Sequence, residues 1–351
     1  MVTQSAGATS RDRQGAELLT TRERQRAGLL TSPERERGGL RTRRERRRAG
    51  AWACCALTLP ILLLVGSAGA WHAKGHDQAV RFAVAASTQP ASTGAATRPA
   101  EPLPGFFTDG VELIAHCSQD PDVFTQPIAP AQLNDAEAPE HYFDMELLGG
   151  DRLPDLRSDY LELISKKGLK TLNIGLLPYG VTEWTQRLTV TFAEHRKWPD
   201  NVCIRQKCLV YAGTLSHYAA DLCQPLHTTI DYDGRTKDGK SPRSGIHRKV
   251  DALLGKVAYD RRRVLADLET APFDKLFPAV RDQIDRSHAL VDRVYDLKDL
   301  LPDMDAPAGD EPKVLDFATD RMRACARFTA SLYLTAWRDS QTIKLPEWHK
   351  R

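Results

Sequence analysis

Histidine and aspartate recur at a four-residue spacing in two short segments of this chain. The first segment, HYAADLCQPLH, contains His217 and Asp221, with His227 just beyond a proline. The second segment, GIHRKVD, contains His247 and Asp251. Residues four apart on a helix share a face, with Cβ atoms about 5–6 Å apart, and imidazole and carboxylate groups are common ligands of divalent metals. These five side chains therefore predict coordination of one ion or of neighbouring ions.

Further candidate ligands lie upstream. His76 is in WHAKGH, His141 is in EHYFDMELL, and Asp122 is in CSQDPDVF, where Asp120 is the reserve candidate. This set is too large for one ion, so three ions with shared carboxylates and open positions fit better. Ligands without thiolates favour Zn²⁺ over Mn²⁺ or Fe. Open positions favour catalysis, and clustered divalent ions are suited to the hydrolysis of phosphate esters.

Helical periodicity dominates the chain after residue 70, and no useful alternating run predicts a strand. We therefore expect an all-α domain over residues 71–351, with the site between facing helices. Residues 119–155 read as ordered loops around the site, and the Ser/Thr/Ala/Pro-rich residues 87–104 as a flexible surface insertion. The expected helices cover 76–86, 104–118, 155–167, 178–197, 202–223, 245–269, 274–300 and 312–340.

The first 50 residues differ from the rest. They contain thirteen arginines against six acidic residues, a net charge of +7, and little apolar periodicity. Such a segment is disordered by composition. It is interpreted as a basic leader or as sequence upstream of the true start, with a nucleic-acid-binding arm as the alternative.

Residues 51–70, AWACCALTLPILLLVGSAGA, carry no charge and end in Ala68-Gly69-Ala70. A basic region, an apolar run and an A-x-A site predict a signal peptide, cleaved after Ala70, and hence export to the periplasm or beyond the cell. The alternative is an uncleaved anchor, since about 20 apolar residues can span a bilayer.

The expected mature chain has 36 basic and 40 acidic residues, a net charge of −4, so the basic balance belongs to the leader. Its overall charge gives no strong case for a nucleic-acid partner. In an exported protein its five cysteines could form two disulfides and leave one thiol, with the pairing left open. They are Cys117, Cys203, Cys208, Cys223 and Cys325.

Taken in order, the motifs resemble the superfamily of zinc-dependent phospholipases C and single-strand-specific nucleases of the S-one/P-one type. Members have an N-terminal Trp, then His, Asp, His, a His-x3-Asp-x5-His block and a final His-x3-Asp or His-x3-Glu. The matching positions here are Trp71, His76, Asp122, His141, His217, Asp221, His227, His247 and Asp251. The resemblance covers residues 71–251, and the remaining C-terminal helices suit the all-α fold of this superfamily.

The resemblance implies three zinc ions. Asp122, His141 and His217 would hold the first. His76 and Trp71, through its α-amine and carbonyl, would hold the second, with Asp221 as a bridge between the two. The third would be held by His227, His247 and Asp251. A terminal amine binds metal only when it is free, which agrees with cleavage after Ala70.

Two details favour the nuclease branch. The step from Trp71 to His76 is W-x4-H, as in the nucleases, and the last ligand is Asp251 where the phospholipases typically have Glu. Tyr142 and Asp144 match the aromatic and acidic residues that bind a base in the nucleases. Alternatively, Tyr142 packs on the core and Asp144 orients a ligand histidine. Against a nuclease, Thr125 replaces a phosphate-contacting Arg.

We therefore expect an exported zinc-dependent phosphodiesterase. The first expectation is a nuclease and nucleotidase that hydrolyses single-stranded nucleic acid to 5′-phosphate products. Asp221 would be catalytic as a bridge and Asp122 by orienting water. The alternatives are a phospholipase C acting on phospholipid headgroup esters and a zinc-binding protein without turnover. No stable protein partner is implied.

Overall fold

The computed structural model describes residues 73–88, 101–237 and 239–351. Within these ranges the regular elements are helices, and β-pairing is limited to isolated bridges such as Phe143 with Gly175. The prediction of an all-α fold is therefore confirmed.

The longest helices form the framework. They are α1 (Ala73–Ser87), α8 (Leu177–Lys197), α9 (Val202–Leu222), α12 (Leu276–His288) and α14 (Pro312–Asp339). The shorter helices are α2 (Gly105–Asp109), α3 (Val111–Cys117), α4 (Asp120–Phe124), α5 (Ala131–Glu137), α6 (Arg157–Lys166), α7 (Thr171–Ile174), α10 (Ile246–Lys256), α11 (Arg261–Leu265) and α13 (Val291–Asp296). Single 3-10 turns are η2 (Ala138–His141), η3 (Met145–Leu148), η4 (Pro225–Thr228) and η5 (Ser340–Thr342).

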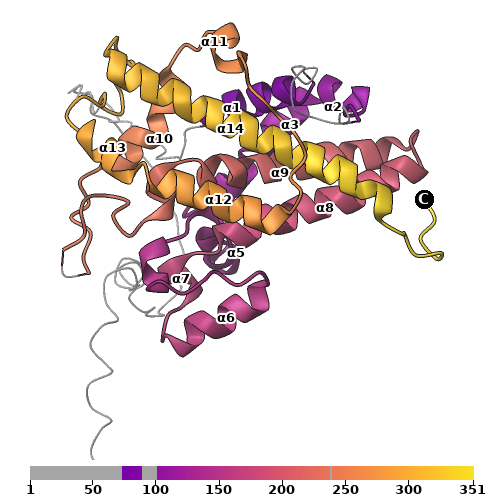
Figure 1. Cartoon of the computed structure of the whole chain (residues 1–351), viewed down its shortest axis with the longest axis horizontal. Helices are drawn as coiled ribbons and strands as arrows, with labels where there is room; N and C mark the ends of the chain where they lie inside the picture. The colour runs from indigo at the N-terminus through magenta and orange to yellow at the C-terminus, as the bar shows by residue number, and fades with distance from the viewer. Residues whose placement is uncertain (1–72, 89–100, 238) are drawn as a thin grey trace, which may run out of the picture. The chain divides into compact units, whose positions relative to one another are not determined.

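Helix α9 lies at the centre of this framework. It runs back along α8 after a short turn, and it also packs on α1, α3 and α14, while α14 packs on α1 and α8 (Figure 1). From Leu215 to Leu222 every residue of α9 is buried. The polar side chains in this stretch are therefore enclosed by protein, which is unusual for residues without a structural or chemical role.

Local sequence explains where these helices begin. Pro178 occupies the first turn of α8, and Pro312 that of α14, where the missing N–H costs no hydrogen bond. Asn201 caps α9, because its side chain accepts hydrogen bonds from the N–H groups of Cys203 and Ile204 at 3.0 and 3.2 Å. Pro225 follows the end of α9 and begins η4 instead.

Several predicted boundaries were wrong. The expected helix 245–269 is broken because Val257 is extended, and Asp260 then caps α11 by accepting a hydrogen bond from the N–H of Arg262. The expected helix 274–300 ends at His288 and resumes as α13. The range 104–118 holds two helices, and 119–155 contains α4, α5, η2 and η3 rather than loops alone.

A glycine in α9 allows α3 to approach closely. A Cβ atom at Gly213 would lie 2.6 Å from the carbonyl oxygen of Ile114 and 2.7 Å from Cβ of Cys117. Any larger residue would push the two helices apart. This contact brings the end of α3, including Ser118, against the part of α9 that carries His217.

Gly175 fixes the turn between α7 and α8 next to His141. Its φ is +90°, and a Cβ atom there would lie 1.8 Å from the carbonyl oxygen of Tyr142. We expect Gly175→Ala to lower the free energy of unfolding by on the order of 3 kcal/mol, since strain and a backbone clash add. Urea unfolding measures it. Gly105→Ala is the control, because no atom lies within 4 Å of the added Cβ; equal losses in the two variants would contradict this interpretation.

The cysteines found in the described residues are all free thiols, so the two expected disulfides are not formed in this structure. Among these five described cysteines, Cys203 is exposed and the other four are buried. No helix in the described ranges is both long and apolar enough to cross a membrane. The basic leader, the hydrophobic run 51–70, Trp71 and most of the 87–104 insertion lie outside the described residues.

Candidate metal centre

Eight of the nine residues singled out as ligands lie in one continuous cluster, and Trp71 lies outside the described residues. Helix α9 contributes His217 and Asp221, and α10 contributes His247 and Asp251. The others come one each from α1, α4, η2 and η4: His76, Asp122, His141 and His227. Asp120, the reserve candidate, belongs to none of the groups that could hold an ion.

Asp221 lies at the centre of this cluster and is fully buried. Its Oδ2 is 3.1 Å from Nδ1 of His141 and 3.3 Å from Nε2 of His217. Its other oxygen, Oδ1, is 3.7 Å from Nε2 of His76. One carboxylate therefore faces two sets of imidazoles with different oxygens, which is the arrangement that a bridging ligand requires.

Two groups of potential ligands share the helix α9. One consists of His76, His217 and Asp221, and the other of Asp122, His141 and His217. In each group the candidate ligand atoms lie within 4.8 Å of one another. The rings of His76 and His217 stack with centroids 4.0 Å apart. The shared histidine places the two groups side by side.

The third group joins η4 to α10. Nε2 of His247 is 2.9 Å from Oδ2 of Asp251 and 3.2 Å from Nε2 of His227. Oδ1 of Asp251 is 3.6 Å from Nε2 of His227. One candidate ligand atom from each of these three residues also lies within 4.8 Å of the other two, so each of the three groups offers three ligand atoms.

Backbone carbonyls orient two of the imidazoles. Nδ1 of His217 is 2.8 Å from the carbonyl oxygen of Ser118, and Nδ1 of His227 is 2.6 Å from that of His141. These bonds leave Nε2 of each ring directed into the cluster. Such outer contacts fix the tautomer of a metal-binding histidine. No sequence signal identifies a carbonyl in this role.

Gln224 was missed by the sequence reasoning. It is fully buried, and its Nε2 donates a hydrogen bond of 2.8 Å to Oδ1 of Asp251. Its position between Asp221 and His227 was the available signal. The amide holds the carboxylate of Asp251 toward His227 and His247.

We expect Gln224→Leu to weaken the binding of one metal ion about 10- to 100-fold, because outer-shell partners contribute that much to ligand orientation. Zinc titration with counting of bound ions measures this. Gln283→Leu is the matched control, since Gln283 is buried but bonds to Ser287 rather than to a candidate ligand. Three ions bound with unchanged affinity in the Gln224 variant would contradict the assignment.

Glu137 is a second missed residue. Its Oε1 accepts a short hydrogen bond from the hydroxyl of Tyr218 and lies 3.8 Å from Nε2 of His141. Nδ1 of His141 faces Asp221 at 3.1 Å. Glu137 therefore lies on the far side of the His141 ring from the cluster, where it can orient that ring.

The charges in the cluster are strongly coupled. Burial raises the pKa of Asp122 to about 6. Burial alone would also raise the pKa of Asp221, but the charges of His217 and His227 hold it well below its usual range. Burial and the neighbouring His217 hold the pKa of His76 well below its usual range. A buried set of carboxylates and imidazoles with such shifts is typical of a functional site.

The cluster is closed at its centre and open along one edge. The side chains of His76, His217 and Asp221 have no exposed surface. By contrast, the side chain of Asp122 is 13% exposed and that of His247 is 22% exposed. These two residues lie in different groups and are the most exposed members of the cluster, and together they are called its open edge here.

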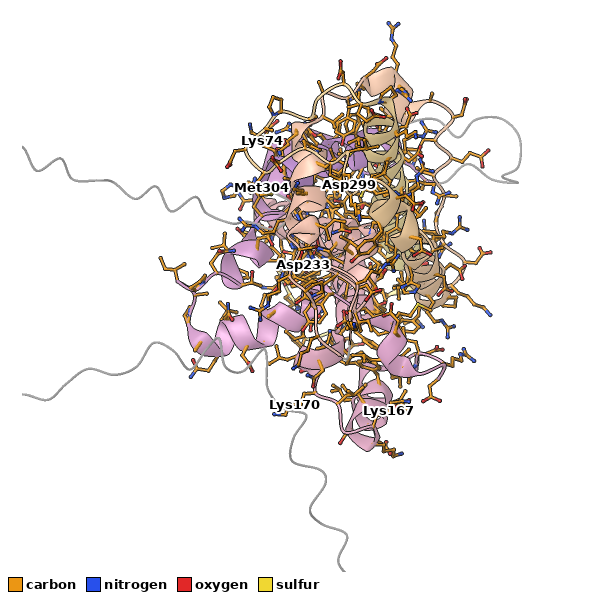
Figure 2. All side chains as sticks on the ribbon, turned by 90° about the vertical axis from the view of Figure 1, so that its left-hand side faces the viewer. Lys74, Lys167, Lys170, Asp233, Asp299 and Met304 are labelled. Atoms are coloured by element: carbon orange, nitrogen blue, oxygen red, sulfur yellow. The ribbon has the colours of Figure 1, made fainter. Side chains whose placement is uncertain are left out.

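The loop that leads into α10 contacts His247, the more exposed of these two residues. Asp233 accepts a hydrogen bond of 2.7 Å from the N–H of Gly245, and it is labelled near the middle of the face in Figure 2. Tyr232 packs edge-on against His247, with ring centroids 5.6 Å apart. Asp233 thus caps α10, whose N-cap residue is Gly245.

Tyr142 and Asp144, the predicted substrate-binding residues, lie directly after His141. The hydroxyl of Tyr142 donates a hydrogen bond of 2.7 Å to the carbonyl oxygen of Leu172, and its ring is partly buried. Asp144 is buried, with 6% of its surface exposed. Thr125 donates from its hydroxyl to the carbonyl oxygen of Asp122 at 2.9 Å.

Comparisons with known proteins add little to this geometry. No family model matches the chain, and the search of curated proteins finds no match. Among solved structures, alpha toxin from Clostridium absonum is similar with a TM-score of 0.41 and 11% identity, covering 78% of this chain and 65% of that chain. Alpha-toxin of an avian strain of Clostridium perfringens gives a TM-score of 0.38 and 13% identity, covering 79% and 65%. The chain spans 65% of the length of both toxins.

Proposed function

We propose that this protein is a zinc-dependent hydrolase of phosphoric diesters. The observation that carries the proposal is the convergence of eight histidine and aspartate side chains into three adjoining groups. Three protein ligands per ion leave a position for water or substrate, as in catalytic zinc sites. The donor set, imidazole nitrogen and carboxylate oxygen, fits Zn²⁺.

The proposed assignment follows the groups. Asp122, His141 and His217 hold one ion, and His227, His247 and Asp251 hold another. The remaining ion is held by His76 and Asp221, with Trp71 as the further proposed ligand. When bound, the ions supply an activated water and positive charge for the developing phosphorane.

The side chains have distinct proposed roles in this reaction. Asp221 holds the geometry of the two adjoining groups, because its two oxygens face different histidines. Asp122 lies at the open edge, where its carboxylate can accept a hydrogen bond from the attacking water and orient it. Burial of His76, His217 and Asp221 excludes bulk water from the centre, which strengthens the electrostatic interactions there.

A phospholipid is the substrate that the surroundings of the site favour. Residues 123–134, VFTQPIAPAQLN, follow Asp122 at the open edge and contain no charged side chain. Thr125 supplies no positive charge for a nucleic-acid phosphate. Asp144, a predicted partner of a base, is buried. These three features support a diester that is joined to apolar chains.

Single-stranded nucleic acid is the second candidate substrate. Tyr142 is partly exposed beside His141, where its ring could stack on an unpaired base. Residues 235–249, which end at the third group, contain six basic side chains and one acidic side chain. Such a segment suits contact with phosphates along a polymer.

The test compares substrates on one preparation. Zinc-loaded protein is assayed on single-stranded DNA, on RNA, on phosphatidylcholine and on a soluble aryl phosphodiester. Hydrolysis of the soluble diester that is lost on chelation supports the proposal, and the preferred natural substrate separates the two candidates. Bound zinc with all four substrates intact would show a zinc-binding protein without turnover.

Export and maturation are part of the proposal. N-terminal sequencing of the protein from its natural host is expected to show a start at Trp71. A start further along the chain would remove Trp71 from the site and contradict its proposed role as a ligand.

A further inference from the structure

We infer that the segment beside Asp122 docks the protein on a lipid surface, an inference that rests on the proposed diester hydrolase. Four exposed apolar side chains lie within eleven residues of one another. They are Val123 (53% exposed), Phe124 (36%), Ile128 (88%) and Leu133 (38%), here called the apolar rim. Large apolar side chains so exposed and so close together indicate an interaction surface.

The rim is part of one local structure. Helix α4 carries Val123 and Phe124, and α5 carries Leu133. Asn134 donates from its side chain to the carbonyl oxygen of Thr125 at 2.5 Å, which ties α5 to the end of α4. The rim is therefore held in a fixed shape before it meets a partner.

The chemistry of this segment suits an apolar phase. Residues 123–134 have no charge, although 27% of the whole chain is charged. The polar side chains Thr125 and Gln126 both bond to the carbonyl oxygen of Asp122, at 2.9 and 3.0 Å. Pro127 and Pro130 have no N–H to satisfy. Thr125 and Gln126 therefore add little cost in unpaired polar groups on entry into lipid.

The apolar rim is adjacent in the chain to a residue of the metal centre. Val123 follows Asp122 directly, and the Asp122 side chain forms part of the open edge of the metal centre. A lipid whose apolar chains contact the rim would present its phosphate near this edge. Because the rim begins at the residue after Asp122, docking through the rim would bring a lipid layer beside the metal centre.

A lipid surface fits the rim better than a protein partner or a nucleic acid. Ile128 is 88% exposed at the link between α4 and α5, so the rim protrudes. A protein interface normally surrounds an apolar centre with polar and charged residues, whereas residues 123–134 supply no charge and the nearest charged side chains, Asp122 and Asp135, lie at the two ends of the segment. A nucleic acid requires positive charge, which this segment also lacks.

The experiment measures binding and hydrolysis separately. Flotation with phosphatidylcholine vesicles uses the chelated mature protein that begins at Trp71, so that the lipid stays intact and the apolar run 51–70 cannot contribute to binding. We expect Ile128→Ser combined with Leu133→Ser to weaken vesicle binding at least about tenfold, since two apolar side chains no longer enter the lipid. Binding by the unaltered protein is expected to be unchanged between about 0.1 and about 1 M salt, because no charge takes part.

The matched control alters apolar residues of similar exposure elsewhere. Val202 is 60% exposed at the start of α9 and Leu156 is 62% exposed before α6. Val202→Ser with Leu156→Ser is expected to bind vesicles like the unaltered protein. Equal binding by the rim variant and this control would overturn the inference. So would binding that needs anionic lipid and disappears in salt, or a dimer that forms through the rim while vesicles stay unbound.

Hydrolysis distinguishes this inference from the proposed function. With zinc, the ratio of vesicle hydrolysis to soluble-diester hydrolysis is expected to fall at least about tenfold in the rim variant. A protein that cleaves the soluble diester but does not float with vesicles would overturn the inference that the rim docks on lipid, and would leave the proposed hydrolase intact. A protein that floats through the rim but cleaves no ester would overturn the proposed hydrolase.

Discussion

Replacing Asp221 with asparagine is expected to reduce hydrolysis of a soluble diester by on the order of 10³-fold or more. Asp221 is the residue that joins two of the three groups, with His141 and His217 on one oxygen and His76 near the other. An amide presents one oxygen and carries no charge, so it cannot bridge two cations. We therefore expect the variant to retain fewer zinc ions, with the ions of the two adjoining groups lost and that of the third group kept.

The measurement combines zinc content with initial rates at saturating zinc. Asp120→Asn is the control, because Asp120 lies two residues from Asp122 but outside every candidate group. It is expected to retain its ions and most of its rate. A full zinc complement with normal rates in the Asp221 variant would contradict the bridging role. Circular dichroism distinguishes metal loss from unfolding.

The prediction of the site depended on spacing within helices. His217 with Asp221 and His247 with Asp251 each share one helix face, so their proximity followed from four-residue spacing. His76 and His141 lie far in sequence from these two pairs. Only the resemblance to the superfamily, which depends on the order of its motifs along the chain, linked them to the site. Local periodicity carries no information about which helices pack together, so the structure was needed to bring α1 and η2 against α9.

The parts that sequence did not predict depend on tertiary contacts. Ser118 was not identified because its contribution is a backbone carbonyl, which every residue has. Glu137 and Gln224 were missed because a single buried polar residue has no repeating pattern. The break at Val257 was missed for a related reason: helical periodicity continued, while Asp260 supplied a competing cap for a new helix.

Zinc binding is expected to strengthen steeply as pH rises, which is the second prediction with a large effect. Burial alone would lower the pKa of His217, but Asp221 and Asp122 raise it to about 9 in the metal-free protein. Burial likewise opposes a charged His227, but Asp221 and Asp251 raise its pKa to about 9. Both imidazoles are therefore protonated at pH 7, and zinc must displace two protons. The apparent affinity of the protein for its full set of zinc ions should then rise about 100-fold per pH unit between about pH 6, the pKa of Asp122, and about pH 9.

The same proton linkage should affect the stability of the metal-free and the zinc-bound protein in opposite directions as pH rises. The pKa values of His217 and His227 are raised, so in the metal-free protein their contribution is complete below the unfolded value of 6.5 and is lost as pH rises through about 9. The pKa of Asp221 is lowered, so its contribution is lost only on acidification below its ordinary value. Zinc replaces the lost protons, and its stabilisation grows over the same range.

Calorimetry with zinc and with chelator at pH 6, 7 and 8 measures this difference. Where zinc is at about 1,000 times its Kd, one site adds about 4 kcal/mol, which corresponds to a Tm difference on the order of 10 °C for a domain of this size. The difference in Tm between the protein with zinc and the protein with chelator is expected to widen from pH 6 to pH 8. His217→Gln should make the pH dependence of zinc affinity shallower, to about tenfold per unit, because one displaced proton is removed. His116→Gln, at an exposed position outside the cluster, should leave it unchanged. A Tm difference between zinc and chelator that stays constant with pH would mean that zinc does not displace protons from His217 and His227.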